Sequence, residues 1–411
     1  MNVKRAKLRK KLEYRSIDVL QWCAYSVLVG IIAGGAGCLF GLAIDKATTI
    51  RQTYDWLCWF MPLAGLLIVL IYRACHIDKV MGTNRVLLAV HQESGIALRM
   101  MPLIFSASFL THLTGGSSGR EGAALQIGGS IGNFVGRKIR MSHVDLRTMT
   151  MCGMSAGFSG LFGTPLAAAL FSMEVAGGEL HYAALFPCLM SSTVARLTAK
   201  AMGGGAEKFI VPGIPEFSAR TALASIVLGV MLAFLSMLFC VAMHSAPHLY
   251  AQYLKNPYVR IAVAGLFISA VTTLMGTRDY NGAGTYVIER AIEGEAVPYA
   301  FLLKILFTAL TLGAGFKGGE IVPSFYIGAT FGCTAAPLLG LDPGFAAALG
   351  MAGMFCGVTN CPISSILLAY EMFGSESLIL FALCCSMSYL LSGHYSLYTA
   401  QKLVHDKFHL E

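Results

Sequence analysis

A glycine-rich stretch, GGSSGREG (Gly115–Gly122), separates two apolar runs and places an Arg and a Glu between them. A glycine-rich break followed by an apolar helix presents unpaired backbone N–H groups at the positive end of the helix dipole. Such a helix start binds anions, and glycine lets an ion approach the backbone closely. A carboxylate there can fill the anion site while ionised and leave it when protonated. The pattern predicts that Glu121 is a gating carboxyl that also carries a proton.

The alternative is a loop at the membrane interface in which Glu121 pairs with Arg120. Composition favours membrane depth, because 56% of the 411 residues are hydrophobic and 13% are charged, against about 25% charged residues in a soluble domain. Four charge-free runs can each cross a hydrocarbon layer of about 30 Å as a helix, namely 148–173, 221–254, 321–341 and 377–401. The chain is therefore expected to be an all-α polytopic membrane protein, in which an ionisable residue at membrane depth is functional by default.

Fourteen apolar segments are expected as helices, and several are interrupted by Gly or Pro. They are 17–44, 56–72, 100–113, 121–137, 148–163, 165–177, 183–199, 221–243, 259–276, 299–315, 321–340, 343–359, 361–374 and 377–393. Short, interrupted segments in corresponding halves of a transporter indicate broken helices around a site near the bilayer midplane.

The two halves of the chain repeat one order of motifs. In GFSGLFGTPLAAALFSMEV and GMFCGVTNCPISSILLAYEMF, a proline precedes a glutamate by nine residues, which aligns Pro165 and Glu174 with Pro362 and Glu371. Because Glu174 and Glu371 occur symmetrically, they are expected to be structural hydrogen-bonding groups. Two transmembrane repeats, 17–205 and 206–400, inverted across the membrane, are predicted.

The chain ends are expected on the cytoplasmic side. Residues 1–16 form a basic segment whose first fifteen residues hold seven Lys and Arg, and the positive-inside rule places such a segment in the cytoplasm. A basic arm for nucleic acid is the weaker interpretation, because a membrane span follows directly. Residues 401–411 are expected as a short cytoplasmic tail. The expected location is the inner (cytoplasmic) membrane of a bacterium, in contact with lipid.

A second glycine turn, GFKGGEIVPSFYIGATFG, aligns Glu320 with Glu121 as its repeat partner. An ionised carboxylate beside an anion path would repel the anion by several kcal/mol at low effective dielectric. Burial favours the neutral acid, and a protonated carboxyl donates a hydrogen bond that suits a small, hard anion. Glu320 is therefore predicted to belong to the proton route and the anion path. The alternative is a salt bridge to Lys317 that only holds the turn.

Four motifs, GREGAALQIGGSIG, FGTPLAAALFSMEV, GGEIVPSFYIGATFG and NCPISSILLAYEM, resemble in order the core motifs of the CLC family of anion channels and proton-coupled antiporters. The resemblance extends from about residue 78 to 400. It implies the CLC fold of two inverted repeats with broken helices, a homodimer with one anion pathway per subunit, and Glu121 as the gating glutamate. Family members often add cytosolic nucleotide-binding (CBS) domains, for which this chain is expected to have no room.

The departures from chloride-type motifs resemble the fluoride-specific CLC-F branch. The first turn reads MGTNRVL instead of the serine-containing GSGIP type, the second-half turn carries Glu320, and Val175 follows Glu174 where a proton glutamate is usual. The resemblance implies a fluoride/proton antiporter that binds its anion with Thr83 and Asn84, whose amide N–H₂ is a good donor. The alternative is a chloride channel or chloride/proton exchanger of the same family.

The remaining candidates for the anion path follow from the same motifs. Tyr398 lies in LYTAQ, which is similar to the LYSA segment whose tyrosine hydroxyl lines the family's inner anion site, with an interfacial aromatic as the alternative. Phe325 and Tyr326 can offer positive ring edges to an anion or pack in the core. The other predicted anion contacts are Gly119, Arg120, Gly122, Ile321 and Val322.

Other classes of function lack their motifs. An intramembrane enzyme needs a nucleophile with a base or a metal cluster, and the sequence has no HExxH, no GxSxG and no paired Asp motif. The twelve cysteines lie mostly inside apolar runs and are expected to pack as small apolar residues, not as disulfides or metal ligands. No metal, cofactor or nucleic acid is expected. Fluoride ions and protons are the expected partners.

Overall fold

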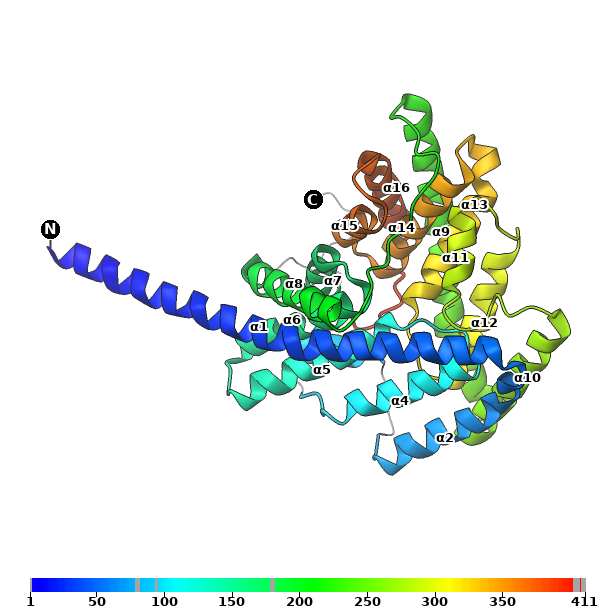
Figure 1. Cartoon of the computed structure of the whole chain (residues 1–411), viewed down its shortest axis with the longest axis horizontal. Coiled ribbons are helices and arrows are strands. Elements are labelled where there is room, and N and C mark those ends of the chain that lie inside the picture. Colours follow the sequence, from blue (N-terminus) through cyan, green and yellow to red (C-terminus); the bar gives the residue numbers. More distant parts are fainter. Residues whose placement is uncertain (1, 78–81, 93–94, 178–181, 402–406, 408–411) are drawn as a thin grey trace.

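A computed structural model describes residues 2–77, 82–92, 95–177, 182–401 and 407 of the chain. Within these residues the fold is all-helical, with sixteen α-helices, two short 3-10 helices and no β-strand. Figure 1 shows α1 as a long helix that crosses the view, with α2, α4 and α5 below it and its N-terminal part extending beyond the other helices. The helices of the second half lie mainly toward the right of this view.

The helices of the first half are α1 (Asn2–Thr53), α2 (Met61–Ala74), α3 (Thr83–Gln92), α4 (Met100–Leu113), α5 (Glu121–Lys138), α6 (His143–Phe162), α7 (Pro165–Gly177) and α8 (Leu185–Ala201). Those of the second half are α9 (Ala219–Tyr253), α10 (Pro257–Met275), α11 (Thr285–Ile292), α12 (Ala300–Ala314), α13 (Ile321–Leu339), α14 (Pro343–Thr359), α15 (Pro362–Phe373) and α16 (Leu378–Leu391). The 3-10 helices are η1 (Asp55–Phe60) and η2 (Tyr182–Ala184).

The apolar runs predict fourteen of these α-helices and miss α3 and α11. These two are short and mix charged with apolar residues, so a search for membrane spans does not detect them. The expected segment 56–72 begins inside η1, because Pro62 at the start of α2 favours a new helix there. Both α1 and α9 also continue past their expected ends.

Several helices expose apolar side chains on the outer surface of the protein, as contact with lipid requires. Five helices are long and apolar enough to cross a membrane by length and composition, namely Asp18–Thr53, Asp55–Ala74, Ala219–Tyr253, Pro257–Met275 and Ile321–Leu339. Large apolar side chains are exposed along α1, α2, α9 and α10, for example Leu39, Leu63, Phe234 and Phe267. All twelve cysteines are free, and ten of them are buried, so the expectation that they pack as small apolar residues is confirmed for those ten.

Glycines let the central helices of each half cross closely. A Cβ on Gly128 of α5 would lie 2.1 Å from the carbonyl oxygen of Gly153 on α6. The second half repeats this crossing, because a Cβ on Gly328 of α13 would lie 2.2 Å from the carbonyl oxygen of Gly350 on α14. Small residues at such crossings allow backbone contact inside a membrane, and the repeat predicted from the sequence motifs appears here as a repeated packing.

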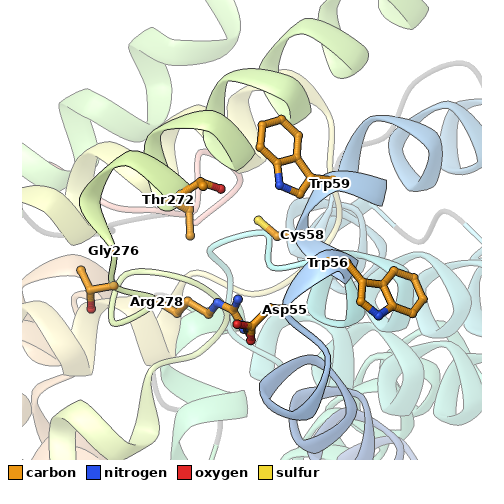
Figure 2. A pocket seen from close by; sticks show the side chains of 9 residues that line it. Asp55, Trp56, Cys58, Trp59, Thr272, Gly276 and Arg278 are labelled. Atoms are coloured by element: carbon orange, nitrogen blue, oxygen red, sulfur yellow. Dashed lines mark ion pairs between the residues drawn. The ribbon is translucent and has the colours of Figure 1, made fainter.

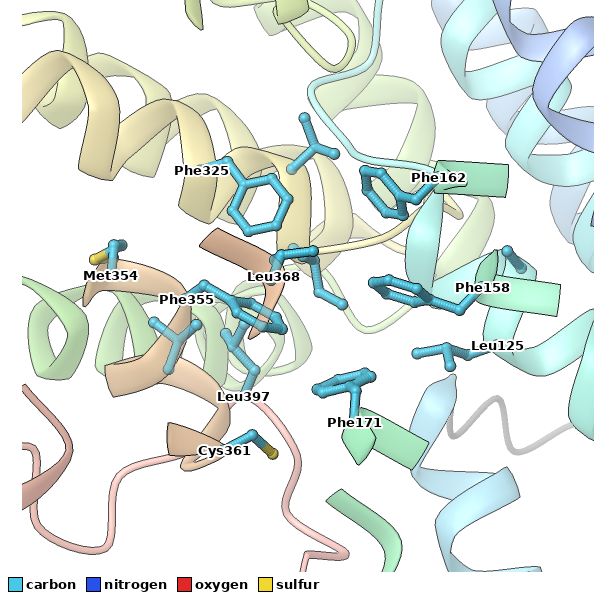
Figure 3. Packing of buried hydrophobic residues seen from close by; sticks show 14 of the residues in the cluster. Leu125, Phe158, Phe162, Phe171, Phe325, Met354, Phe355, Cys361, Leu368 and Leu397 are labelled. Carbon is cyan, nitrogen blue, oxygen red and sulfur yellow. The ribbon is translucent and has the colours of Figure 1, made fainter. Parts of the chain in front are cut away.

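Five phenylalanines join the two halves in a closed ring of contacts (Figure 3). Phe158 and Phe171 belong to the first half and have ring centroids 5.4 Å apart, and Phe171 lies 5.3 Å from Phe355 of the second half. Phe355 contacts Phe325 at 5.3 Å, and Phe325 contacts Phe162 at 6.1 Å. Phe162 closes the ring, because its centroid lies 4.8 Å from that of Phe158. Edge-to-face and tilted pairs of this kind stabilise beyond simple burial.

Two glutamates cap helices of the opposite half. The Glu371 carboxylate accepts hydrogen bonds from the backbone N–H groups of Leu166 (3.0 Å) and Ala167 (2.8 Å) at the start of α7. Glu174 accepts the N–H groups of Ile363 (3.1 Å) and Ser364 (2.8 Å) at the start of α15, and the Ser364 hydroxyl also donates to it. Both residues are therefore structural hydrogen-bonding groups, as predicted.

Replacing Glu371 by Ala should lower the free energy of unfolding by about 1 kcal/mol, the size typical of a lost helix cap. The loss arises because Leu166 and Ala167 would keep unpaired N–H groups. Unfolding of the purified protein in detergent by heat or denaturant measures it. Glu376→Ala removes an exposed glutamate nearby and serves as the control; equal midpoints for the two variants would contradict the assigned role.

Candidate functional site

The two glycine turns meet at the centre of the molecule. Gly119 and Gly319 form an antiparallel backbone pair, with N–H···O distances of 2.7 and 2.6 Å. A Cβ on Gly319 would lie 2.8 Å from the Gly122 nitrogen, so glycine is required for this close approach. Both α5 and α13 begin directly after the pair, and the starts of two helices from opposite halves therefore face each other inside the protein.

This pairing corrects the predicted alignment of the two glutamates. Since Gly119 is equivalent to Gly319, Arg120 is equivalent to Glu320, and both are the N-cap residues of their helices. Glu121 is the first residue of α5 and corresponds to Ile321. The predicted pairing of Glu121 with Glu320 is thus wrong by one residue. Because successive helical residues point about 100° apart, the two carboxyls have different surroundings.

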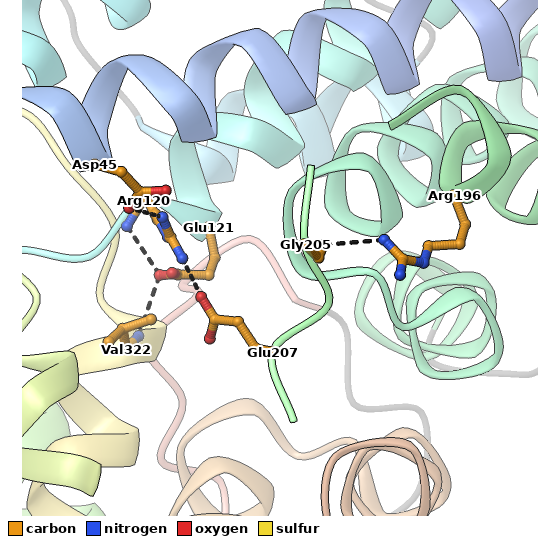
Figure 4. A network of polar contacts seen from close by, with 7 residues as sticks. All are labelled: Asp45, Arg120, Glu121, Arg196, Gly205, Glu207 and Val322. Carbon is orange, nitrogen blue, oxygen red and sulfur yellow. Dashed lines mark hydrogen bonds and ion pairs between the residues drawn. The ribbon is translucent and has the colours of Figure 1, made fainter. Parts of the chain in front are cut away.

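The Glu121 carboxylate lies on the start of α13. Its Oε2 accepts hydrogen bonds from the backbone N–H groups of Arg120 (3.0 Å) and Val322 (3.2 Å), as Figure 4 shows. The residue is fully buried, and Oε1 has no hydrogen-bond partner among the described residues. The carboxylate therefore occupies a position where backbone N–H groups and a helix dipole favour negative charge.

The Arg120 side chain forms its ion pairs with two other carboxylates, as Figure 4 shows. Its guanidinium binds Asp45 of α1 at 2.5 Å and also pairs with Glu207 in the segment between the halves. The alternative prediction, an interfacial loop in which the Arg120 side chain forms an ion pair with Glu121, is therefore wrong. Nothing in the sequence around Asp45 or Glu207 marks them as partners of Arg120, and both were missed because the contact joins distant segments.

Glu320 is half-buried at the start of α13 and lines a cavity of about 390 Å³. No ion pair joins it to Lys317 in the part of the chain that the structure describes. Instead, the Lys317 ammonium lies 5.4 Å from the centre of the Tyr72 ring. The alternative of a salt bridge that merely holds the turn is therefore wrong, and the carboxyl is left to face the cavity.

The first-turn residues are held by hydrogen bonds near the same cavity. The Asn84 Oδ1 accepts a hydrogen bond from the backbone N–H of Ala400 at 3.0 Å, which directs the amide N–H₂ group elsewhere. Asn84 lines the cavity together with Glu320. The Thr83 hydroxyl donates to the carbonyl of Gly122 at 3.4 Å, so it has no second proton to offer an anion.

The aromatic candidates separate into two groups. Tyr398 is buried and close enough to Glu320 and Glu121 to interact with the charge of each. Phe325 is buried in the phenylalanine ring. The Lys304 ammonium lies 4.9 Å from the centre of the Tyr326 ring, and the Tyr326 hydroxyl has no hydrogen-bond partner among the described residues. Of the two tyrosines, Tyr398 is the one that interacts with the charge of Glu121.

The other predicted contacts are backbone groups. The Val322 N–H bonds Glu121, and the Gly119 N–H is taken by Gly319. Ile321 begins α13 and is fully buried, and Gly122 follows Glu121 in α5 with its carbonyl accepting from Gln126 at 3.0 Å. An anion that replaced the Glu121 carboxylate would therefore meet the N–H groups at the start of α13.

A wider cavity of about 720 Å³ lies away from these groups, between η1 and the end of α10 (Figure 2). Its walls include Trp59 and Thr272, and Asp55 pairs with Arg278 there at 2.6 Å. Because this ion pair is exposed to solvent, it adds little to stability. Among the described residues, no group of three or more His, Cys, Asp or Glu side chains is arranged to hold a metal ion.

Comparison with known proteins supports the family resemblance. A family model described as voltage gated chloride channel matches residues 64–393. The chain is 36% identical over 399 residues to a chloride/fluoride channel protein of Pseudomonas syringae pv. tomato, covering 95% of this chain and 88% of that protein. It is 26% identical over 398 residues to a putative chloride channel protein ClcB-like of Ralstonia nicotianae, covering 87% and 92%.

Solved structures show the same fold. A crystal structure of a CLC-type fluoride/proton antiporter superimposes with a TM-score of 0.90 at 32% sequence identity, covering 94% of this chain and 98% of that one. A slow cyanobacterial Cl⁻/H⁺ antiporter superimposes with a TM-score of 0.78 at 18% identity, covering 90% and 94%. The second likeness concerns the fold alone, and it agrees with the all-α CLC architecture predicted from the motifs.

Proposed function

This chain belongs to the voltage-gated chloride channel family, and we propose that it is a fluoride/proton antiporter that exports fluoride in exchange for protons. The observation that carries the proposal is the Glu121 carboxylate bound to the Val322 N–H at the start of α13. A carboxylate held by a helix start occupies an anion site. Proton and anion thus compete for one position, because protonation removes the charge that holds Glu121 there.

Fluoride, rather than chloride, is favoured by the donors that this chain supplies. Fluoride is small and strongly hydrated, so a selective site must replace its water with strong donors. The Asn84 amide is oriented by Ala400 so that its N–H₂ group remains available, and Glu320 offers a second donor when it is protonated. Asn84 and Glu320 line one cavity. Tyr398 is close enough to Glu320 to interact with its charge. The solved fluoride/proton antiporter supports the same assignment.

Glu320 is proposed to receive protons that Glu121 carries inward. Val175 stands where chloride-type relatives are expected to hold their internal proton glutamate, and Glu320 has a free carboxyl facing a cavity. Tyr398 is buried and close enough to both glutamates to interact with the charge of each. The two carboxyls then form a proton route through the anion path.

The runner-up is a chloride channel or chloride/proton exchanger. It is supported by the names of the relatives, which include chloride channel proteins and H⁺/Cl⁻ exchange transporters of bacteria. These relatives are 24–26% identical to this chain, below the 36% of the chloride/fluoride relative. Ion flux with one anion at a time separates the two functions.

Liposomes that contain the purified protein should release fluoride much faster than chloride. The expected selectivity follows from the Asn84 and Glu320 donors, which suit a small, hard anion. Ion-selective electrodes measure each anion in turn, with protein-free liposomes as the control. Comparable fluoride and chloride rates would contradict the fluoride assignment and favour a chloride channel or chloride/proton exchanger.

Replacing Glu121 by Gln should abolish proton movement driven by a fluoride gradient, because the amide mimics the protonated acid and cannot titrate. Glu320→Gln should likewise remove the coupled proton flux. Proton uptake and fluoride efflux are recorded together in liposomes, after size-exclusion profiles show that each variant folds. Glu376→Gln, an exposed glutamate, is the control. If a fluoride gradient still drives proton movement through the Glu121→Gln protein, another group carries the protons.

We further propose a homodimer in the bacterial cytoplasmic membrane, with one pathway per subunit and the N-terminus in the cytoplasm. The two repeats, 17–205 and 206–400, and the end segments 1–16 and 401–411 are assigned accordingly. The dimer follows from the family resemblance, and the orientation follows from the basic N-terminal segment.

Mass measurement in detergent and crosslinking in bilayers should find two 43.9 kDa chains in each particle. Dilution at constant detergent is the control, because a chance association within micelles weakens as the protein concentration falls. A particle that contains one chain under all conditions would contradict the dimer.

A further inference from the structure

The cavity that Glu320 lines is bounded by a helix with two histidines. His244 and His248 of α9 line it, and Asn84 and Gln126 of the first half form another part of its wall. The cavity measures about 390 Å³, which is room for several water molecules, since each occupies about 30 Å³ in the liquid. It therefore offers an aqueous approach to the Glu320 carboxyl.

One face of α9 leads toward that carboxyl. Cys240, His244 and His248 are each four residues apart, so their side chains share a face of the helix. The buried Cys240 thiol is close enough to Glu320 for their charges to interact, while His248 is exposed. His244 lies between these two levels. His244 thus lies between the exposed end of α9 and the neighbourhood of Glu320.

The His244 ring has an unused nitrogen. Its Nε2 is buried and has no hydrogen-bond partner among the described residues, although the ring itself is half-buried against the cavity. A buried polar atom without a partner is unfavourable, so such an atom at a cavity wall calls for a role. An imidazole can take up and release a proton near neutral pH, so this nitrogen is placed for proton transfer at the inner wall of the cavity.

Few charged groups face His244 across the cavity. Among the described residues that line it, the other ionisable side chains are Lys317, His248 and Glu320. Lys317 lies over the Tyr72 ring, and His248 is on the exposed side. Glu320 is therefore the one carboxyl in this part of the structure that can exchange a proton with His244, directly or through a cavity water.

The cavity lies near a basic end of the molecule. Arg73 at the end of α2 lies 4.9 Å from the ring centre of Tyr258 at the start of α10. Arg260 donates to the Ala314 carbonyl at 3.1 Å, close to the turn that carries Lys317, and Lys255 lies in the α9–α10 loop. Clustered Lys and Arg beside membrane segments indicate the cytoplasmic face.

We propose that His244 relays protons between the Glu320 carboxyl and water on the cytoplasmic side of the cavity, an inference that rests on the proposed fluoride/proton exchange. During proton import, the protonated Glu320 carboxyl gives its proton to neutral His244, forming a carboxylate and an imidazolium. The imidazolium then releases one proton to water or a buffer base, and the neutral ring is restored. The Glu320 carboxylate takes up the next proton that Glu121 delivers, so that both side chains return to their starting states.

The test is a His244→Ala variant assayed with and without imidazole. Coupled proton and fluoride flux in liposomes should fall about 100-fold or more, the effect typical of losing a positioned proton-transfer group. Millimolar imidazole on both sides should restore most of the rate, because it can enter the space that the side chain leaves. His248→Ala should keep the wild-type rate, because water replaces an exposed ring. A second variant, His244→Gln, should lose the dependence of the rate on cytoplasmic pH near neutrality.

Several results would overturn the relay. His244→Ala with the wild-type rate would mean that cavity water reaches Glu320 unaided. If His244→Ala is slow, binds fluoride normally and does not respond to imidazole, the loss of flux is due to disturbed packing and not to a missing proton relay. If the alanine variant fails to fold, a His244→Gln protein with the wild-type pH profile would also reject the relay. A wild-type protein that moves no protons with fluoride would instead reject the proposed function itself.

Discussion

Every helix that begins inside a membrane protein leaves backbone N–H groups that need an acceptor, and this fold meets that need across its two halves. Glu121 of the first half binds the start of α13, and Glu174 binds the start of α15. Glu371 of the second half binds the start of α7 in return. These three helix starts are therefore capped by carboxylates of the opposite half, and the caps help to join the two halves.

The three carboxylates differ in how firmly they are held. Glu174 accepts three hydrogen bonds, and both oxygens of Glu371 are bonded to backbone N–H groups. Glu121 uses one oxygen for two bonds, and its other oxygen has no partner among the described residues. A carboxylate with an unpaired buried oxygen gives up less when it departs. The difference fits the proposed role of Glu121 as a carboxyl that an anion displaces and a proton releases, whereas Glu174 and Glu371 are fully bonded helix caps.

Close packing surrounds the Glu121 carboxylate. The crossings at Gly128 and Gly328 bring helix backbones into contact, and the phenylalanine ring closes around the junction of the halves. Arg120, the residue before Glu121, is held by ion pairs with Asp45 and Glu207. The proposed displacement of Glu121 therefore involves its side chain and leaves the surrounding helices in place.

The sequence by itself determined the membrane class, most of the helices, the repeated halves and the two glycine turns, because these depend on local composition and on motif order. Glu121 was found this way, since a carboxyl in a glycine break before an apolar helix has a local signature. Short amphipathic helices such as α3 and α11 carry no such signal and were missed.

Tertiary structure decided everything that depends on which side chains meet. It showed that Glu320 corresponds to Arg120 and not to Glu121, because the Gly119–Gly319 pair fixes the register of the two turns. It also directed Arg120 to Asp45 and Glu207, and Lys317 to Tyr72. These partners lie far apart along the chain, and a one-residue shift turns a helical side chain by about 100°, so no local pattern could have placed them.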